Sequence, residues 1–472
     1  MKISPYSAVA FALMTGAIFV TSCTNDIEVD KNIDPAGNAI SFAPSVGHTS
    51  RATETNRDNL GNFAVVARGI HHDGVLYDSF LIGSATAGEV ATREGGSYIW
   101  NLGRNVYWPS TFNEVMFFAY TTLKSRETGE ALYSGSTFGF DSSKNPYIDG
   151  YTPKKADVSV SSDDAAMVWA DGKEQKDLLV AYTKQARSKS PTTVDLKFKH
   201  ALTQISITAK QKDKIDSDHR VVKIKGAWIV NAAKTGKLSG NLNYNPEHQS
   251  TDDKLSWTTT GTDKVAYGSF YNQILELNKD DDMDLLRPEA AGNLLGSLML
   301  VPEDLTEWGK TQNDNGAYIL LLCRVELKHG GATHDGDADM TDILTDGTNH
   351  YHQLFPVNTI TYNAAQYGFV CVPLRSTWNT NGIGKHYTYK LDICGATTGA
   401  GLYPPTLAVD FINKLIPKDS KVGDSALEVV TDRPNGKKVG DAVLDEPIKF
   451  SVSVEDWVTP KDSEWTPGNG TF

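Results

Sequence analysis

The chain has 472 residues, of which 40% are hydrophobic and 22% are charged, and its formal net charge is -13. This composition is typical of a folded protein, and the length suffices for two or three domains. Because a negative field repels phosphate backbones, the charge argues against a nucleic-acid partner and is otherwise explained by solubility.

The first 23 residues predict a lipoprotein signal peptide with a lipobox. Lys2 precedes an apolar run over residues 8–20, which is too short for a stable membrane span. The run ends in valine, threonine, serine and Cys23, and small residues before a cysteine are the pattern that precedes lipid attachment. Acyl chains on Cys23 would anchor the exported protein in the outer membrane, because each buried CH₂ contributes ~0.8 kcal/mol. The alternative is an ordinary signal peptide in which the cysteine has no role.

Residues 24–51 predict an acidic tether followed by a short first strand, which together form a candidate pro-segment. Ile40, Phe42 and Val46 alternate with small or polar residues, so one face of this strand is apolar. Pro44 indicates an edge position or a break, because proline cannot donate to a strand ladder. The polar loop that follows contains Arg51 and is expected to be exposed.

The body of the chain is dense in short strand patterns separated by turn residues, which predicts an all-β protein built of sandwiches or open barrels. The clearest strand patterns are Phe63–Ala67, Val115–Tyr120, Leu178–Tyr182, Val194–Phe198, Ile205–Ala209, Val221–Val230, Tyr318–Val325 and Ile448–Val458. Helical patterns are few, at residues 407–415 and 273–278. A polar stretch over residues 184–193 is the best linker. It divides the body into an N-terminal sandwich over residues 52–190 and a C-terminal sandwich with a terminal strand over residues 191–472.

Three cysteines, Cys323, Cys371 and Cys394, follow the lipobox. An odd number excludes a complete disulfide framework. Cys323 and Cys371 lie in apolar strand patterns and are expected to pack as small hydrophobic residues. One disulfide stays open as an alternative in an exported protein.

No catalytic or metal-binding constellation stands out, so we expect no enzyme activity, no cofactor and no metal site. The chain lacks a Gly-x-Ser-x-Gly elbow, a His-Glu-x-x-His motif and a phosphate-binding glycine loop. Asp335, Asp337 and Asp339 carry carboxylates at alternate positions, as Ca²⁺ loops do, but Met340 stands where such a loop needs glycine. We interpret the stretch up to Asp342 as an acidic surface loop and keep calcium binding as the alternative.

The last strand pattern has the cleanest alternation, with Ile448, Phe450, Val452 and Val454 on one face. Such a strand suits addition to another sheet, in which backbone hydrogen bonds give affinity and alternate side chains fill pockets.

The order of these features resembles the type V fimbrillins, the Mfa-like lipoprotein subunits of surface pili. The resemblance extends over nearly the whole chain, although each motif is short. The stretches that carry it are Ala39-Ile40-Ser41-Phe42, His48-Thr49-Ser50-Arg51-Ala52-Thr53, Asn105-Val106-Tyr107-Trp108-Pro109, Val115-Met116-Phe117-Phe118-Ala119-Tyr120, Asp177-Leu178-Leu179-Val180-Ala181, Leu196-Lys197-Phe198-Lys199-His200-Ala201-Leu202, Leu298-Met299-Leu300-Val301-Pro302, Lys385-His386-Tyr387-Thr388-Tyr389 and Ile448-Lys449-Phe450-Ser451-Val452-Ser453-Val454-Glu455-Asp456-Trp457.

The resemblance implies two transthyretin-like β-sandwich domains in tandem and assembly by donor-strand exchange. In such fimbrillins an Arg-specific protease cuts the loop after the first strand, which here is the bond between Arg51 and Ala52, with Arg57 as a second candidate. The first strand then leaves, and a terminal strand of the next subunit fills the groove.

In this chain the displaced side chains would be Ile40, Phe42 and Val46, and the donor side chains would be Ile448, Phe450, Val452 and Val454. The implied partners are other pilin subunits, an Arg-specific protease and the outer membrane, through lipid on Cys23. The implied location is the cell surface, in a fimbrium.

Alternatives to this interpretation stay open. In the first alternative, both the first and the last strand are permanent parts of their own domains, and Arg51 is never cut. In another reading the chain is a surface glycan-binding lipoprotein that uses exposed aromatic rings as sugar platforms. The tryptophans considered for that role are Trp100, Trp108, Trp257, Trp308, Trp378 and Trp465. The sequence does not distinguish a stalk, tip or anchor role.

Overall fold

The computed structural model describes residues 39–46, 60–71, 75–93, 97–108, 112, 114–121, 136–153, 168–170, 177–186, 193–211, 219–240, 255–259, 264–286, 298–330, 343–346, 349–357, 362–380, 383–395, 398–444 and 446–456. Cys23, Arg51, Ala52, Arg57 and the acidic loop at 335–342 lie outside the described residues. Within the described ranges, no helix is both long and apolar enough to cross a membrane.

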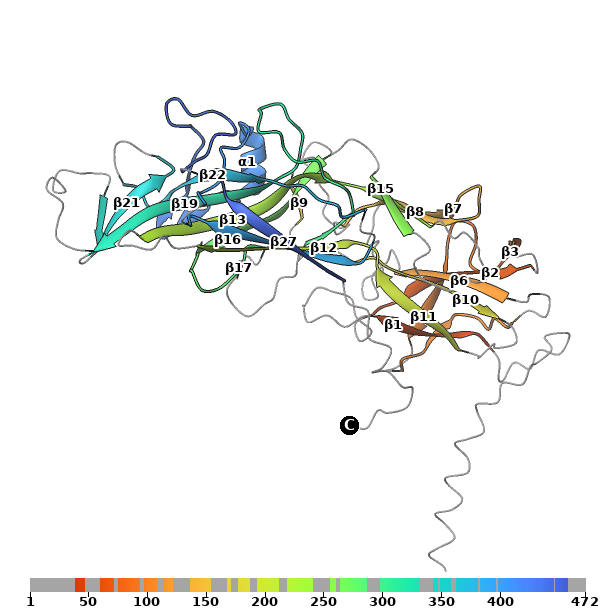
Figure 1. Ribbon diagram of the computed structural model, residues 1–472. Helices are drawn as coiled ribbons and strands as arrows, with labels where there is room; N and C mark the ends of the chain where they lie inside the picture. The colour runs from red at the N-terminus through yellow and green to blue at the C-terminus, as the bar shows by residue number, and fades with distance from the viewer. Residues whose placement is uncertain are drawn as a thin grey trace, which may run out of the picture.

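The first lobe is a closed ring of strands. Its members are β1 (Ser41–Val46), β2 (Phe63–Ile70), β4 (Glu89–Arg93), β5 (Trp100–Leu102), β6 (Glu114–Thr121), β10 (Leu179–Ala186) and β11 (Thr193–His200). The order among the described strands is β2-β4-β5-β1-β11-β10-β6, and β6 pairs back with β2. A further strand, β3 (Leu76–Ile82), pairs with β2 outside the ring. β1 is therefore an internal member of the ring, between β5 and β11 (Figure 1).

Alternate side chains of the ring strands point inward and form one apolar cluster. In β11, Val194, Leu196 and Phe198 are buried, while Asp195 and Lys197 between them are exposed. This period of two is the local signal that predicts a strand with one apolar face. Closing the ring is what removes that face from water.

A smaller sheet joins early and late parts of the chain. Its order is β15-β14-β8-β7, formed by β7 (Thr137–Phe140), β8 (Pro146–Tyr151), β14 (Gly236–Gly240) and β15 (Leu255–Thr259). Phe138, Leu238 and Trp257 from this sheet share a buried cluster with Val66 and Phe118, which lie on ring strands. The small sheet therefore packs on the ring through a core of its own.

The second lobe is built from two sheets with a common core. One has the order β17-β12-β23-β27, with β18 also on β12, and its strands are β12 (Thr203–Gln211), β17 (Met283–Asp284), β18 (Leu298–Leu300), β23 (Lys385–Ile393) and β27 (Lys449–Asp456). The larger one has the order β20-β21-β19-β13-β16-β9, with β22 on β19 and β26 on β22. Its strands are β9 (Val168–Ala170), β13 (His219–Ala233), β16 (Lys264–Glu276), β19 (Tyr318–Gly330), β20 (Ile343–Asp346), β21 (Asn349–Phe355), β22 (Gln366–Pro373) and β26 (Glu428–Val430). Ile205 and Tyr389 from the first sheet and Ile224 and Leu321 from the second belong to one buried cluster.

The C-terminal part of the chain covers the other face of the larger sheet. Phe411 and Leu415 of α1 (Val409–Leu415) join Trp228, Leu320 and Phe369 of the sheet in a separate buried cluster. A two-stranded pair, β24 (Lys421–Val422) with β25 (Ser425–Ala426), follows α1. The helix lies against this sheet in Figure 1. The larger sheet is therefore apolar on both faces, with one face toward each cluster.

The described strands confirm the predicted all-β class, and α1 confirms the helical pattern at 407–415. The helix predicted at 273–278 is wrong, because β16 continues through Glu276 and pairs Leu275 and Glu276 with β13. The closed ring also differs from the two separate sheets of a sandwich, so tandem transthyretin-like sandwiches remain a prediction.

Two further sequence expectations concern the domain boundary and the cysteines. The boundary expected at residue 190 lies between β10 and β11, which pair with each other in the ring. The change from the ring to the sheets of the second lobe comes between β11 and β12. Cys323, Cys371 and Cys394 are buried free thiols, so the alternative disulfide does not form among them. Burial raises the pKa of the Cys323 and Cys371 thiols, which fits their packing as small hydrophobic residues.

Candidate functional site

β1 is held in the ring by backbone pairing on both sides. It runs parallel to β11 through six consecutive residue pairs. On the other side it pairs antiparallel with β5 through Ser41 and Phe42. The amide of Ile40 also donates to the Val106 carbonyl at 2.7 Å. Removal of β1 would therefore open the ring between β5 and β11.

The side chains predicted for the displaced strand, those of Ile40, Phe42 and Val46, are at most 3% exposed. Phe42 packs edge-on against Phe63 and Phe117, with ring centroids 6.1 and 6.2 Å away respectively. Full burial of one such side chain contributes ~1.5–3 kcal/mol, so burial of the three together stabilises β1 by ~5–9 kcal/mol. Loss of the strand would leave an apolar groove of matching length.

Pro44 lies where the ladder on the β5 side has already ended. β5 pairs with the first two residues of β1, whereas β11 pairs with all six. Among the described residues, Pro44 therefore has a ladder partner on the β11 side only, and on the β5 side its missing amide loses no ladder bond. The expected edge position holds for the second half of β1, while the first half is internal.

In contrast to β1, which has a neighbouring strand on each side, β27 lies at the edge of the smaller sheet of the second lobe. Among the described strands it pairs with β23 alone, antiparallel, through eight residue pairs. Phe450, Val452 and Val454 stand opposite β23 residues whose side chains are buried in the core. These three side chains are nevertheless 37%, 42% and 46% exposed, respectively.

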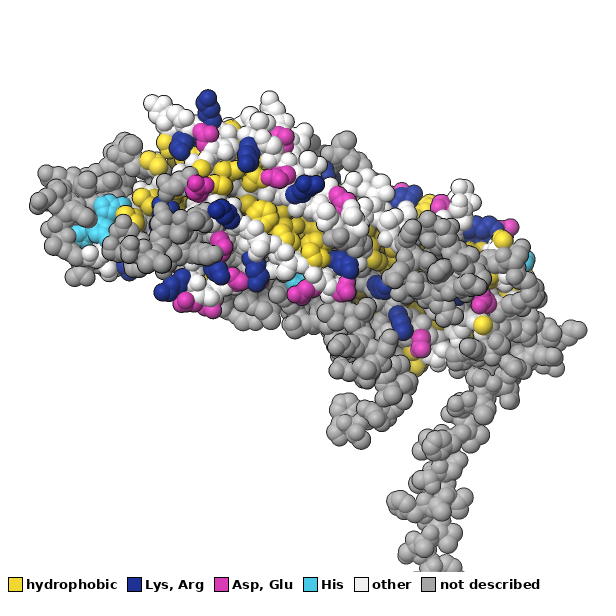
Figure 2. Space-filling model, in the orientation of Figure 1, with side chains coloured by type: hydrophobic (Ala, Val, Ile, Leu, Met, Phe, Trp, Pro, Cys, Tyr) yellow, Lys and Arg dark blue, Asp and Glu magenta, His cyan; other side chains and the backbone are white. Residues whose placement is uncertain are grey.

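A row of apolar side chains is therefore open to solvent along β27. Figure 2 shows a band of hydrophobic side chains on the surface where Figure 1 draws this strand. Ile448, just before the strand, is buried in the same core cluster as β23. An apolar edge strand of this kind is a template for pairing with another chain. The fold thus exposes three of the four predicted donor side chains and buries the fourth.

The apolar residues of β1 and β27 follow the same spacing. The two series are Ile40, Phe42, Pro44, Val46 and Ile448, Phe450, Val452, Val454. Both series have isoleucine, phenylalanine and valine at the first, second and fourth places, and Val452 stands at the third place, where the first series has Pro44. The groove residues that contact β1, such as Trp100 and Leu196, come from distant strands and carry no local signal of that role.

The tryptophans considered as sugar platforms are buried wherever they are described. Trp100, Trp108, Trp257, Trp308 and Trp378 are at most 6% exposed, and Trp465 lies outside the described residues. The Trp100 and Trp257 indole nitrogens donate to backbone carbonyls at 3.0 and 2.6 Å, respectively. The described tryptophans are core residues and offer no stacking surface.

Comparison with known proteins identifies the family of the chain. Residues 50–304, more than half of the chain, match the family model described as fimbrillin-like. No curated protein matches the chain.

Several solved structures are similar at low identity. A fimbrial protein from Bacteroides vulgatus is 13% identical, with 89% of this chain and 99% of that protein covered and a TM-score of 0.42. Candidate cell adhesion proteins from Bacteroides uniformis and Parabacteroides distasonis have the same coverage, with identities of 13% and 10% and TM-scores of 0.30 and 0.35, respectively.

The family model confirms the predicted resemblance to fimbrillins. It also confirms the expectation of a non-enzymatic structural or adhesion protein at the cell surface. By this sequence match, the chain belongs to the fimbrillin-like family.

Proposed function

We propose that the mature chain is a structural subunit, in the stalk or at the tip, of a cell-surface pilus that assembles by protease-triggered donor-strand exchange and supports adhesion. The observation that carries the proposal is the position of β1, a short strand inserted between β5 and β11 in a closed ring. A strand that leaves such a ring creates a groove with free backbone groups and apolar pockets, and another strand is the ligand that suits both.

The proposal begins with export and cleavage. Lipid on Cys23 tethers the chain to the outer membrane, and an Arg-specific protease cuts between Arg51 and Ala52. Before the cut, β1 is covalently joined to the rest of the ring. After the cut only non-covalent contacts hold it, of which side-chain burial is worth ~5–9 kcal/mol. A strand held in this way can be replaced by one that makes equal or better contacts.

The proposed replacement is β27 of the next subunit. β27 has one described neighbour, and three of its apolar side chains are already partly in water, so its release loses less burial than the release of β1. In the groove it would gain a neighbour on both sides. We include two transthyretin-like domains in this proposal, because the ring and the facing sheets each have a core of their own.

The first test is controlled cleavage of the full mature chain with a trypsin-like protease, followed by mass spectrometry and size-exclusion chromatography. We expect loss of the segment up to Arg51 and a ladder of oligomers. The variant Arg51→Ala, with Arg57→Ala as a second variant, identifies the bond that must be cut. A clean cut that leaves a stable monomer would contradict strand exchange and favour an anchor or a glycan-binding lipoprotein.

A second test uses the shared spacing to fix the register. If β27 replaces β1 residue for residue, Ser453 takes the place of Ser45, which stands opposite Lys197 in β11. Ser453→Cys combined with Lys197→Cys should form intersubunit disulfides after cleavage. The matched control is Ser453→Cys with Asp195→Cys, one alternate position away, where no cross-link should form. Equal cross-linking in both pairs would contradict the register.

A further inference from the structure

Three histidines gather on one face of the larger sheet, where β19 pairs with β21. His329 stands directly opposite His350 in this ladder, and His352 lies two residues further along β21. Opposite residues of an antiparallel pair, and alternate residues of one strand, project to the same face. Figure 2 shows a group of histidine side chains at the surface, at the end of the second lobe where Figure 1 draws β21. The sheet therefore collects three imidazoles at the end of the molecule that lies away from the ring.

The alternation along β19 explains the position of this group. Ile319, Leu321, Cys323 and Val325 belong to the core that the two sheets of the second lobe share. His329 continues this series of alternate residues beyond the last member of the cluster, and its side chain is half-buried. The same face of the sheet thus changes from apolar to imidazole-bearing where the shared core ends.

Two of the three rings meet through their nitrogens. The Nε2 atoms of His329 and His352 are 2.8 Å apart, and the ring centroids are 5.0 Å apart with an interplanar angle of 21°. One Nε2 donates and the other accepts, so the two neutral rings have different tautomers. The centroid of the His350 ring lies 5.3 Å from that of His329. The ladder between two paired strands brings these rings together, so no local motif predicts the arrangement.

This spacing of nitrogens suits a shared metal ion. Neutral imidazole nitrogens bind Zn²⁺, Cu²⁺ and Ni²⁺ at ~2.0–2.1 Å. Two such ligands of one ion are separated by about 2.9 Å at adjacent corners of a square plane and by about 3.3 Å in a tetrahedron. The observed 2.8 Å matches the first value closely and lies about half an ångström short of the second. A bound ion replaces the hydrogen bond between the rings, and each ring then keeps its proton on Nδ1.

We propose that His329 and His352 together bind one divalent ion of the copper, nickel and zinc group and so cross-link β19 to β21. Within the described ranges, no group of three or more histidine, cysteine or acidic side chains is placed to hold a metal ion. Water therefore completes the coordination of the ion, which stays exchangeable. Ca²⁺ and Mg²⁺ prefer oxygen ligands and do not suit this pair. The proposal does not depend on strand exchange, because neither histidine belongs to β1 or β27.

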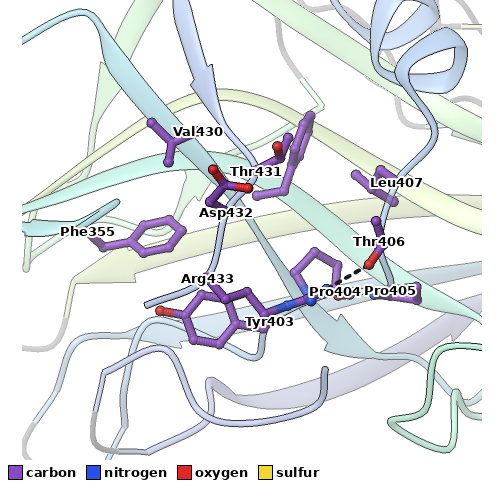
Figure 3. Close-up of a pocket in the computed structure, with 11 residues that line it drawn as sticks. Phe355, Tyr403, Pro404, Pro405, Thr406, Leu407, Val430, Thr431, Asp432 and Arg433 are labelled. Atoms are coloured by element: carbon purple, nitrogen blue, oxygen red, sulfur yellow. Dashed lines mark hydrogen bonds between the residues drawn. The ribbon is translucent and has the colours of Figure 1, made fainter. Parts of the chain in front are cut away.

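The proposed metal site is separate from a pocket of about 260 Å³ that opens on the same lobe beside Arg433. Residues 403–407 and 430–433 form the walls of this pocket (Figure 3). Nη2 of Arg433 donates to the Pro404 carbonyl at 2.9 Å, so the guanidinium fastens one wall to the other. None of the three histidines lines the pocket, so its contents do not bear on metal binding.

The test is isothermal titration calorimetry of the full mature chain, without an affinity tag, with Ni²⁺ as the probe. We expect His352→Gln to weaken Ni²⁺ binding at least tenfold. A glutamine amide can keep a hydrogen bond to His329, but it is a poor ligand for this ion, so the variant separates metal binding from folding. His71→Gln is the matched control, because His71 is an exposed histidine outside the group, and it should bind as the unchanged chain does.

A second measurement is the thermal unfolding midpoint with and without excess Ni²⁺. The ion should raise the midpoint of the unchanged chain and of His71→Gln, but not that of His352→Gln, since only a bound ligand stabilises the fold. His329→Gln should reproduce the loss seen in His352→Gln from the other strand. The proposal is overturned by an absence of Ni²⁺ binding or by an affinity that both glutamine variants of the pair leave unchanged. Equal weakening in His71→Gln would also overturn it, because the ion would then bind to scattered surface histidines.

Discussion

The first and last strands of the described chain carry the same apolar spacing in opposite surroundings. In β1 the side chains of Phe42 and Val46 are buried in a ring that closes around them, whereas in β27 the phenylalanine and both valines stay partly in water. The isoleucine just before each strand is buried. β1 is paired on two sides and β27 on one among the described strands. An alternating pattern therefore specifies a strand with an apolar face, but the number of neighbours decides how much of that face is buried.

The largest expected difference comes from a matched pair of phenylalanine substitutions. Phe42→Ala should destabilise the protein by ~3–5 kcal/mol, because it leaves a cavity inside the ring. Phe450→Ala should change stability by ~1 kcal/mol or less, since that ring is already 37% exposed. Urea unfolding followed by tryptophan fluorescence measures both. Equal shifts of the unfolding midpoint would break the comparison between β1 and β27.

The second prediction concerns a buried ion-pair cluster in the second lobe, which stabilises the larger sheet independently of β27. Buried Glu326 pairs with Arg324 and, at 2.7 Å, with Lys223. Burial alone would raise the pKa of Glu326, but Arg324, Lys223 and the Tyr362 hydroxyl together lower it. Glu326→Gln should cost ~3 kcal/mol at neutral pH, because it leaves the buried Arg324 and the partly exposed Lys223 without their carboxylate partner.

The pH dependence of the stability lost in Glu326→Gln is the control for this prediction. A carboxyl whose pKa is lowered in the folded state stabilises the fold above its unfolded pKa of ~4.3 and loses this contribution as pH falls through the lowered value. The difference between Glu326→Gln and the unchanged chain should therefore shrink in urea unfolding series run below about pH 4. A constant difference down to pH 3 would show that the substitution acts through packing instead.

A matched valine pair sharpens the comparison on a smaller scale. Val46→Ala should cost ~2 kcal/mol, because Val46 is almost fully buried, and Val452→Ala should cost well under ~1 kcal/mol. Differential scanning calorimetry under one buffer condition measures both. The prediction is that Val46→Ala loses more stability than Val452→Ala, so a larger loss at Val452 would contradict it.

The smallest effect is expected at the end of β27. Asp456 pairs with Lys385 of β23, and the Asp456 side chain is 76% exposed. Exposed ion pairs contribute ~0–1 kcal/mol, so Asp456→Asn should change thermal stability by no more than that, and less at high salt. A larger loss would mean that β27 is held by its charged end rather than by its ladder with β23.

Sequence alone determined the features that depend on near neighbours along the chain. The period of two and the turn residues predict the all-β class, and the same alternation gives one apolar face to both the first and the last strand. The family also follows from sequence. Local patterns fail at residues 273–278, where pairing with β13 extends β16 through a stretch that resembles a helical turn.

Tertiary structure decided which of two equal patterns is buried. The closure of the ring depends on β2 pairing with both β4 and β6, and on β1 lying between β5 and β11, which come from distant parts of the chain. The pocket beside Arg433 likewise needs residues 403–407 and 430–433 to meet over the larger sheet. Local sequence does not encode these contacts, because burial is set by the partners that the rest of the chain brings to each strand.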